Sequence, residues 1–267
     1  MALHLLSIEI RKTVKHPALW IGLGCLAVLL AIVQLVSHAQ IAGGYNPASG
    51  GLESDLLSAL FLFQWVGILA YATTAATIAA SDYPDRSIQL WLARGVPRPM
   101  LLTMRLIAIL LFSLLIVVFT FLFNLGLAAL SRQLFFGAVD AFNLNLAALL
   151  PAVLRVFWGA LPYLALTVLL AIVSRSPFFA AGGAIIYATV LENLLLTGVQ
   201  RHFPALVKYL PITLTRTLQT ANLALDRAAP FEAFAVPQLQ TAVFIGAWFI
   251  IIYALSLLIF IRQDLGG

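Results

Sequence analysis

The sequence predicts an all-α integral membrane protein with six transmembrane helices, and three observations support this fold class. Hydrophobic residues make up 63% of the 267 residues and charged residues only 9%, whereas soluble domains carry about 25% charged residues. The mean hydropathy is +1.04. Six apolar runs are each long enough to cross a hydrocarbon core of ~30 Å, which requires roughly 18 helical residues.

The apolar runs are distributed along the whole chain, so we treat residues 1–267 as a single transmembrane domain. The runs do not alternate polar and apolar residues as the strands of a membrane barrel do. Ser37-His38-Ala39 resembles a signal-peptidase site, but the run before it exceeds the 7–15 apolar residues of a signal peptide, so we expect a retained span. The predicted spans cover approximately residues 18–37, 57–80, 104–130, 151–173, 178–198 and 240–261.

Residues 1–16 predict an amphipathic interfacial helix before the first span. Leu3, Leu6, Ile10 and Val14 recur at helical spacing and form an apolar face. Charged residues occupy the remainder of the helical wheel, which is the pattern of a helix lying on a membrane surface. We therefore expect this segment to contact lipid rather than nucleic acid, because basic juxtamembrane segments are attracted to anionic lipid.

The distribution of basic residues predicts that both termini face the cytoplasm of a multi-pass protein in the cell membrane. Nine of the 15 Lys and Arg residues fall on the side of the N-terminus, and the 38–56 loop contains none. Cytoplasmic loops carry the excess of Lys and Arg. The outer segment 199–239 contains four basic residues and two apolar pieces, at 203–210 and 231–236, which predict short helices between spans five and six.

The segment between the second and third spans predicts a short helix with a defined start and end. Asp85 can cap a helix that begins at Arg86. Gly95 can end this helix, and Pro97 and Pro99 prevent it from continuing. A helix of two turns is not stable alone in water, so it must pack against another surface.

Three side chains of this short helix share one face, namely Ile88, Trp91 and Leu92. Two surfaces could receive them. The helix could rest on the inner leaflet with Trp91 as an interfacial residue. Alternatively, it could insert into a cytoplasmic partner protein.

The layout resembles the membrane subunits of ABC-2 type transporters over nearly the whole chain. An amphipathic helix at 1–16 precedes the first span, Asp82 ends the second, and Val96-Pro97-Arg98 leads into the third. Leu191-Glu192 and Tyr209-Leu210-Pro211 also resemble features of that family. The sequence departs from the family pattern at Asp82, where the family often has Glu followed by a Gly-Thr step.

The resemblance implies an ATP-driven exporter in which the helix at 86–95 is the coupling helix. This helix would dock on a separate cytoplasmic ATPase, and a second permease copy or a homologous permease would complete the translocation path. The chain contains no Gly-x-x-x-x-Gly-Lys-Ser/Thr loop, so ATP hydrolysis would belong to the partner. The coupling candidates are Asp82, Asp85, Arg86, Ile88, Trp91, Leu92 and Arg94.

Glu192 is a carboxylate well inside a predicted span. A charge at the membrane centre costs roughly 2.5–3.5 kcal/mol on insertion scales, so this side chain needs a partner. Arg155, near the outer end of the fourth span, lies at a suitable depth. Two roles remain open, a polar lock between helices or a point in the translocation path or gate together with Pro211.

The sequence predicts no catalytic site, cofactor site or metal centre. The histidines are not placed in the middle of a span, and the single cysteine, Cys25, excludes an internal disulfide and a cysteine metal cluster. Two alternative functions fit the apolar composition. One is a structural or assembly subunit of another membrane complex, and the other is an ion-coupled carrier. The residues do not indicate the transported substrate.

Overall fold

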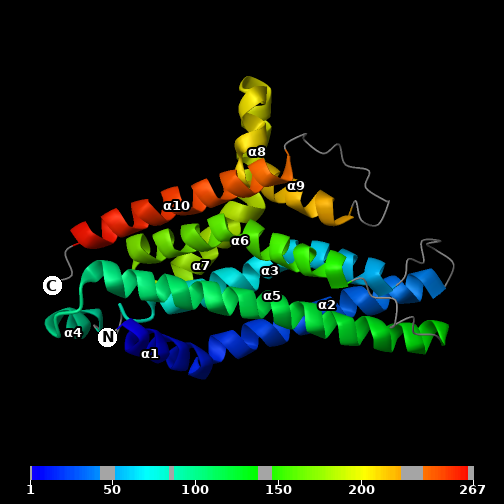
Figure 1. Cartoon of the computed structure of the whole chain (residues 1–267), viewed down its shortest axis with the longest axis horizontal. Helices are drawn as coiled ribbons and strands as arrows, with labels where there is room; N and C mark the ends of the chain where they lie inside the picture. Colours follow the sequence, from blue (N-terminus) through cyan, green and yellow to red (C-terminus); the bar gives the residue numbers. More distant parts are fainter. Residues whose placement is uncertain (1, 43–51, 84–86, 138–145, 224–236, 264–267) are drawn as a thin grey trace.

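The computed structural model describes residues 2–42, 52–83, 87–137, 146–223 and 237–263. All regular structure within these ranges is helical. The long helices α2, α3, α5, α6 and α10 run along the longest axis of the molecule (Figure 1). The elements are α1 (Ala2–Lys15), α2 (Pro17–Ala42), α3 (Leu52–Ala80), α4 (Ser87–Ala93), α5 (Arg98–Phe136), α6 (Leu146–Ser174), α7 (Pro177–Ile186), η2 (Tyr187–Leu191), α8 (Glu192–His202), η3 (Pro204–Tyr209), α9 (Pro211–Leu223) and α10 (Gln238–Arg262).

Five helices in the described ranges are long and apolar enough to cross a membrane. They are Pro17–Gln40, Arg98–Phe136, Leu149–Ser174, Pro177–His202 and Gln238–Arg262. A sixth is obtained if the two parts of α3, Asp55–Phe63 and Val66–Ala80, count as one span bent by 49°. The helices thus have the character of a multi-pass membrane protein, and each predicted span falls within one helix or, for the fifth, within the series α7, η2 and α8.

The centre of the bundle is formed by α3, α5 and α6. α3 packs against α2, α5, α6 and α7, and α6 also packs against α10. The second half of α3 is rich in alanines that are almost completely buried, Ala72, Ala75, Ala76, Ala79 and Ala80. Small side chains let helices approach one another closely in a membrane, so α3 can pack closely against several neighbours.

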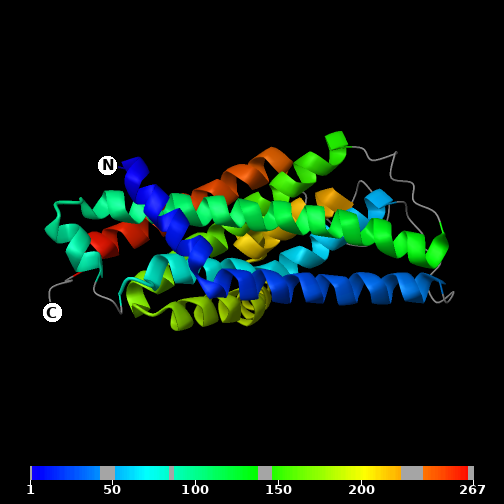
Figure 2. The same cartoon turned by 90° about the horizontal axis from the view of Figure 1, so that it is seen from below.

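Figure 1 and Figure 2 show the start of α1, the end of α10 and the short helix α4 at one end of the bundle, which we call the α4 end. The C-terminal ends of α2 and α5 and the start of α3 lie at the other end, which we call the distal end. The start of α1 and the end of α10 therefore lie at the same end of the bundle.

The helix α1 packs on α5 and α3 through a face that differs from the predicted apolar face. Among the α1 side chains that the structure describes, Leu5, Glu9 and Thr13 are buried and Leu6 and Ile10 are partly buried against the core, whereas Val14 is 42% exposed. The reason is electrostatic, because Glu9 turns inward toward a buried arginine described below. α1 therefore binds the protein through a mixed polar and apolar stripe.

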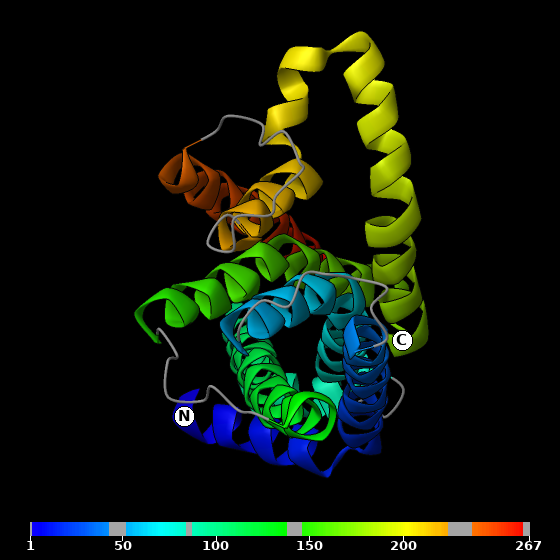
Figure 3. The same ribbon diagram turned by 90° about the vertical axis from the view of Figure 1, so that its right-hand side faces the viewer.

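The last part of the fifth predicted span leaves the bundle, and the chain then returns. Figure 3 shows α8 projecting from the bundle, and the chain then turns through η3 and back into α9. η3 falls within the predicted apolar piece 203–210, while the piece 231–236 lies outside the described residues. α9 begins at Pro211 and packs on α6, α10 and α3, so this helix is part of the packed core rather than a surface element.

Candidate functional site

A buried charge cluster at the α4 end joins three helices. Arg105, in the second turn of α5, is only 1% exposed. Its Nε donates to Glu9 Oε1 of α1 at 3.3 Å, and its Nη1 donates to the carbonyl oxygen of Ala79 at 3.2 Å. Its Nη2 donates to Asp82, whose other carboxylate oxygen accepts from Lys12. Two acids and two bases thus share one site.

This cluster fixes the point at which the chain leaves α3. Asp82 is 4% exposed, and a buried carboxylate is tolerated only when opposite charges and hydrogen bonds compensate its lost hydration. Arg105 and Lys12 supply that compensation from α5 and α1. The sequence placed Asp82 correctly at the end of the second span, but it did not identify these partners.

The helix α4 follows this cluster and ends in a Schellman motif. Gly95 has a left-handed φ of 78°, and its N–H donates to Leu92 O at 2.9 Å. The N–H of Val96 donates to Trp91 O at 3.2 Å. These are the two hydrogen bonds that define the motif, and they confirm Gly95 as the end of the short helix.

The apolar face of α4 packs against its own chain. Ile88 is 2% exposed, while Trp91 and Leu92 are half-buried against the core. Leu90 is 62% exposed, and the exposed Arg94 holds its guanidinium carbon 5.6 Å from the centroid of the Trp91 ring. A partner that contacts α4 from outside would therefore meet Leu90 and Arg94 first. The candidates Asp85 and Arg86 lie outside the described residues.

The start of α5 is also tied to the end of α10. Arg98 Nη1 donates to the carbonyl oxygens of Ile261 and Gln263, at 2.7 and 2.8 Å. Gln263 Nε2 in turn donates to Ile172 O of α6 at 3.0 Å. Asp82 and Arg98, which flank α4 in the sequence, are therefore bound to α1 and α5 and to the end of α10, respectively.

Glu192 lies at the junction of three helices deeper in the bundle. The side chain is 2% exposed. The hydroxyl of Tyr163 in α6 donates to Oε2 at 2.7 Å, and the backbone N–H of Ile212 donates to Oε1 at 2.8 Å. Pro211 begins α9 immediately before Ile212, so the carboxylate binds the N-terminus of that helix, where a negative charge is favoured.

The predicted pairing of Glu192 with Arg155 is wrong. Arg155 instead donates to Asn222 Oδ1 at 3.0 Å and to Gln238 Oε1 at 3.4 Å. The pairing failed because depth in the membrane was the only criterion, whereas the two side chains bind different residues of α9, Ile212 and Asn222. The arginine nearest to this junction is Arg216 of α9, whose Nη2 donates to Asn193 Oδ1 at 2.8 Å.

A second polar cluster lies at the distal end, and sequence reasoning missed it. His38 of α2 is 1% exposed. Its Nδ1 lies 2.6 Å from Ser131 Oγ of α5, and its Nε2 lies 3.1 Å from Asp55 Oδ2 of α3. Arg132 Nε also donates to Asp55 Oδ2 at 2.5 Å. The signal available in the sequence was that His38, Asp55 and Ser131 are polar residues near the ends of three separate predicted spans.

The distal cluster combines Ser, His and Asp, but its geometry favours a structural role. Ser131 is completely buried, and its Oγ donates to the carbonyl oxygen of Ala128 at 3.1 Å. A nucleophilic serine needs open space in front of it for a substrate. In the part of the chain that the structure describes, no group of three His, Cys, Asp or Glu side chains is placed to hold a metal ion.

Comparisons with known proteins place the chain in a family. A search of curated protein sequences found no match. A family model described as "Protein of unknown function (DUF2705)" matches residues 26–265, from the middle of α2 past the end of α10. Because this match spans most of the sequence and all of the sites described above except the Glu9 and Lys12 side chains, the chain belongs to the DUF2705 family.

Proposed function

We propose that the chain is the membrane-spanning permease subunit of an ABC-2 type exporter. It crosses the membrane six times, counting bent α3 as one span, with the α4 end in the cytoplasm. Two permease chains form the translocation path, and a separate ATPase supplies the energy. One observation carries the proposal: α4 packs its apolar face against the bundle at the end where the start of α1 and the end of α10 also lie.

The way in which α4 is held would let it transmit force. A force on α4 reaches Asp82 through the chain on one side and Arg98 through the chain on the other. Asp82 is bound to α5 and α1 by Arg105 and Lys12, and Arg98 is bound to α10. Because packed helices move as rigid bodies, a displacement of α4 is passed to several spans at once.

The outward surface of α4 suggests the chemistry of its partner. Leu90 and Arg94 are the exposed apolar and charged side chains of this short segment. A groove with an apolar floor and an acidic rim would accept both. A surface of this kind is typical of protein interfaces, where arginine is enriched.

Co-purification tests the proposal directly. The chain is expressed in its native host with an affinity tag, extracted in mild detergent, and its partners are identified by mass spectrometry. We expect a protein that contains an ATP-binding phosphate loop. The charge reversal Arg94→Glu should weaken this association, whereas the matched reversal Arg201→Glu, at the exposed end of α8, should not. Full recovery of the ATPase with Arg94→Glu would contradict the role of α4.

A second candidate function is an ion-coupled carrier, and buried Glu192 is the observation that favours it. Membrane carboxylates often serve as proton sites. The two functions differ in their energy source. A carrier reconstituted alone in liposomes transports in response to a pH gradient, and Glu192→Gln abolishes that transport. An exporter subunit reconstituted alone shows no such transport. The third alternative, an assembly subunit of another complex, predicts a co-purifying partner without an ATP-binding motif.

A further inference from the structure

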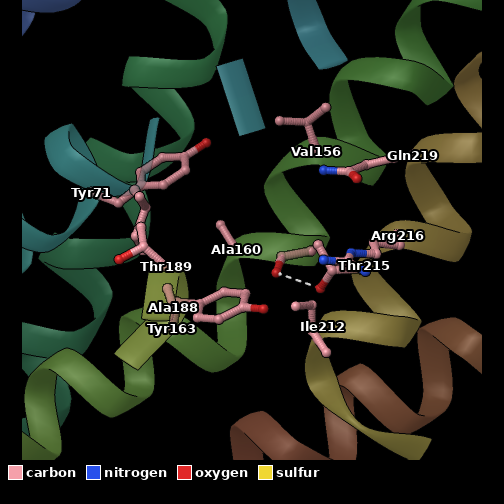
Figure 4. Close-up of a pocket in the computed structure, with 12 residues that line it drawn as sticks. Tyr71, Val156, Ala160, Tyr163, Ala188, Thr189, Ile212, Thr215, Arg216 and Gln219 are labelled. Atoms are coloured by element: carbon pink, nitrogen blue, oxygen red, sulfur yellow. Dashed lines mark hydrogen bonds between the residues drawn. The ribbon is translucent and has the colours of Figure 1, made fainter. Parts of the chain in front are cut away.

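A small cavity lies between α3, α6, η2 and α9 (Figure 4). Its volume is about 60 Å³. Its walls are mainly apolar, including Ile68, Val156 and Ala160, but several hydrogen-bonding side chains also reach it. The polar lining residues are Tyr71, Tyr163, Thr189, Thr215, Arg216 and Gln219. An apolar cavity with a few convergent polar groups is the usual form of a ligand site.

The hydroxyl of Tyr71 points to a missing ligand. Tyr71 is 3% exposed, and its Oη has no hydrogen-bond partner among the described residues. Buried hydroxyls almost always have a partner. In Figure 4 Tyr71 lies on the α3 side of the cavity, with Ala160 of α6 beside it and Arg216 of α9 on the far side. A bound acceptor atom in the cavity would satisfy this hydroxyl.

The opposite wall of the cavity adds a positive charge. Arg216 reaches the cavity from α9, where its Nη2 donates to Asn193. The carboxylate of Glu192 interacts electrostatically with Arg216 but does not line the cavity, and its two oxygens accept hydrogen bonds from Tyr163 and the N–H of Ile212. The cavity therefore presents donors and a cation, which suit an anionic group.

The mouth of the cavity indicates how a ligand would arrive. η2 is a π-helix, a widened turn that is frequent at functional sites, and it contributes Ala188 and the exposed Thr189 to the lining. The neighbouring side chains Ile186 and Val190 are at least half exposed. An apolar surface beside the opening favours a ligand that carries an apolar tail, because that tail can lie along η2.

We propose that this cavity binds the anionic head of an amphiphile, with the hydroxyl of Tyr71 and the guanidinium of Arg216 as donors to its phosphate or carboxylate oxygens. The apolar tail leaves the cavity along η2. This site is separate from the α4 end and does not depend on coupling to an ATPase. A phospholipid and a single-chain phosphate share this head chemistry, so the test includes both.

Binding is measured on the purified full chain in a neutral maltoside detergent. The probes are dodecyl phosphate, a dioleoyl phosphatidic acid, inorganic phosphate and dodecanol. Native mass spectrometry counts the bound molecules, and the shift of the thermal unfolding midpoint gives the apparent affinity. We expect one molecule of dodecyl phosphate or phosphatidic acid per chain, and weak or absent binding of inorganic phosphate and dodecanol.

Variants with matched chemistry decide whether the cavity is the site. Tyr71→Phe removes only a hydroxyl that has no protein partner, so folding should be preserved while affinity for dodecyl phosphate falls about tenfold, the effect of losing one hydrogen bond to a charged group. Tyr253→Phe removes a hydroxyl outside the cavity, where it lies 2.9 Å from Thr103 Oγ1, and should leave the affinity unchanged.

Four results would overturn the proposal. Equal affinities for Tyr71→Phe and Tyr253→Phe would place binding elsewhere. Dodecanol binding as tightly as dodecyl phosphate would show that the head is not recognised. Inorganic phosphate binding as tightly as dodecyl phosphate would show a site for a free anion. If no probe binds at one molecule per chain, the cavity holds only water. A difference between the affinities for dodecyl phosphate and phosphatidic acid identifies whether a single-chain phosphate or a phospholipid fits the cavity better.

Discussion

The guanidinium of Arg105 donates to the carboxylate of Asp82, and this contact joins α5 to the residues that follow α3. Both side chains are almost completely buried. Around them, Glu9 and Lys12 complete a site with two negative and two positive charges. The contact means that α3 and α5 cannot separate at the α4 end without breaking these ion pairs.

Removal of Arg105 should therefore strongly destabilise the protein. Arg105→Met leaves two acids and one base in the buried site, which typically costs about 3–5 kcal/mol. The double variant Arg105→Met with Asp82→Asn retains one acid and one base, so its loss should be smaller than the sum of the two single losses. Unfolding in mixed detergent micelles, followed by tryptophan fluorescence, measures these values. Strictly additive losses would show that the two side chains do not interact.

The left-handed conformation of Gly95 should make it sensitive to substitution. Gly95→Ala places a Cβ at φ 78°, which costs roughly 1–2 kcal/mol in local backbone energy. No atom lies within 4 Å of that Cβ, so crowding does not contribute. Gly126→Ala is the matched control, because it adds an equally unobstructed Cβ within α5 and should leave stability unchanged or raise it by up to about 1 kcal/mol. Similar effects at both positions would contradict the Schellman ending.

Glu192 should contribute to stability through both of its oxygens. Glu192→Ala leaves the Tyr163 hydroxyl and the Ile212 N–H without an acceptor, at about 1–3 kcal/mol for each buried group. Glu192→Gln can keep one acceptor and turn its amide toward Tyr163, so the loss should be closer to ~1 kcal/mol. Transport and thermal stability are measured together. Reduced stability with unchanged transport supports the polar lock and counts against a role in the translocation path.

Two buried serines of α5 allow a test of the distal cluster. Ser131 Oγ lies 2.6 Å from His38 Nδ1, whereas Ser113 Oγ is buried without a hydrogen-bond partner in the described structure. Ser131→Ala should cost about 1 kcal/mol, and Ser113→Ala should cost little or nothing. Thermal unfolding of both variants provides the comparison. An equal loss at the two positions would mean that the His38 contact contributes nothing to stability.

The orientation can be tested by cysteine labelling. In a Cys25→Ser background, Arg94→Cys and Arg201→Cys each place one thiol at an exposed position. A membrane-impermeant maleimide should label Arg201→Cys on intact cells and Arg94→Cys only after permeabilisation. The reverse pattern would place the α4 end outside and would remove the basis for contact with a cytoplasmic ATPase.

The apolar spans and the ends of several helices could be predicted from sequence because they depend on local composition. Gly95 ended its helix as predicted, since the left-handed position and the following prolines act within a few residues. The long helices matched the apolar runs for the same reason. Helical faces were harder to predict: the apolar stripe at Leu6 and Ile10 is only half-buried, and α1 turns Glu9 inward instead.

The partners of polar residues could not be predicted because they come from distant parts of the chain. Arg105 lies 96 positions from Glu9, and His38 lies 93 positions from Ser131. Only the folded arrangement of α1, α2 and α5 brings these residues together. The wrong pairing of Glu192 with Arg155 shows why depth alone does not predict partners, since many polar groups share a given depth. The packing of α9 in the core was also not predicted.

The position of α9 has a consequence for the order in which the protein is assembled in the membrane. α9 has 13 residues and is too short to span a ~30 Å hydrocarbon layer. It binds α6 through Asn222 and Thr215, whose side chains donate to carbonyl oxygens of that helix. It also packs against α10, which is synthesised later. The contact between α9 and α10 can therefore form only after α10 has been synthesised, and the docking of α9 is expected to be a late step of biogenesis.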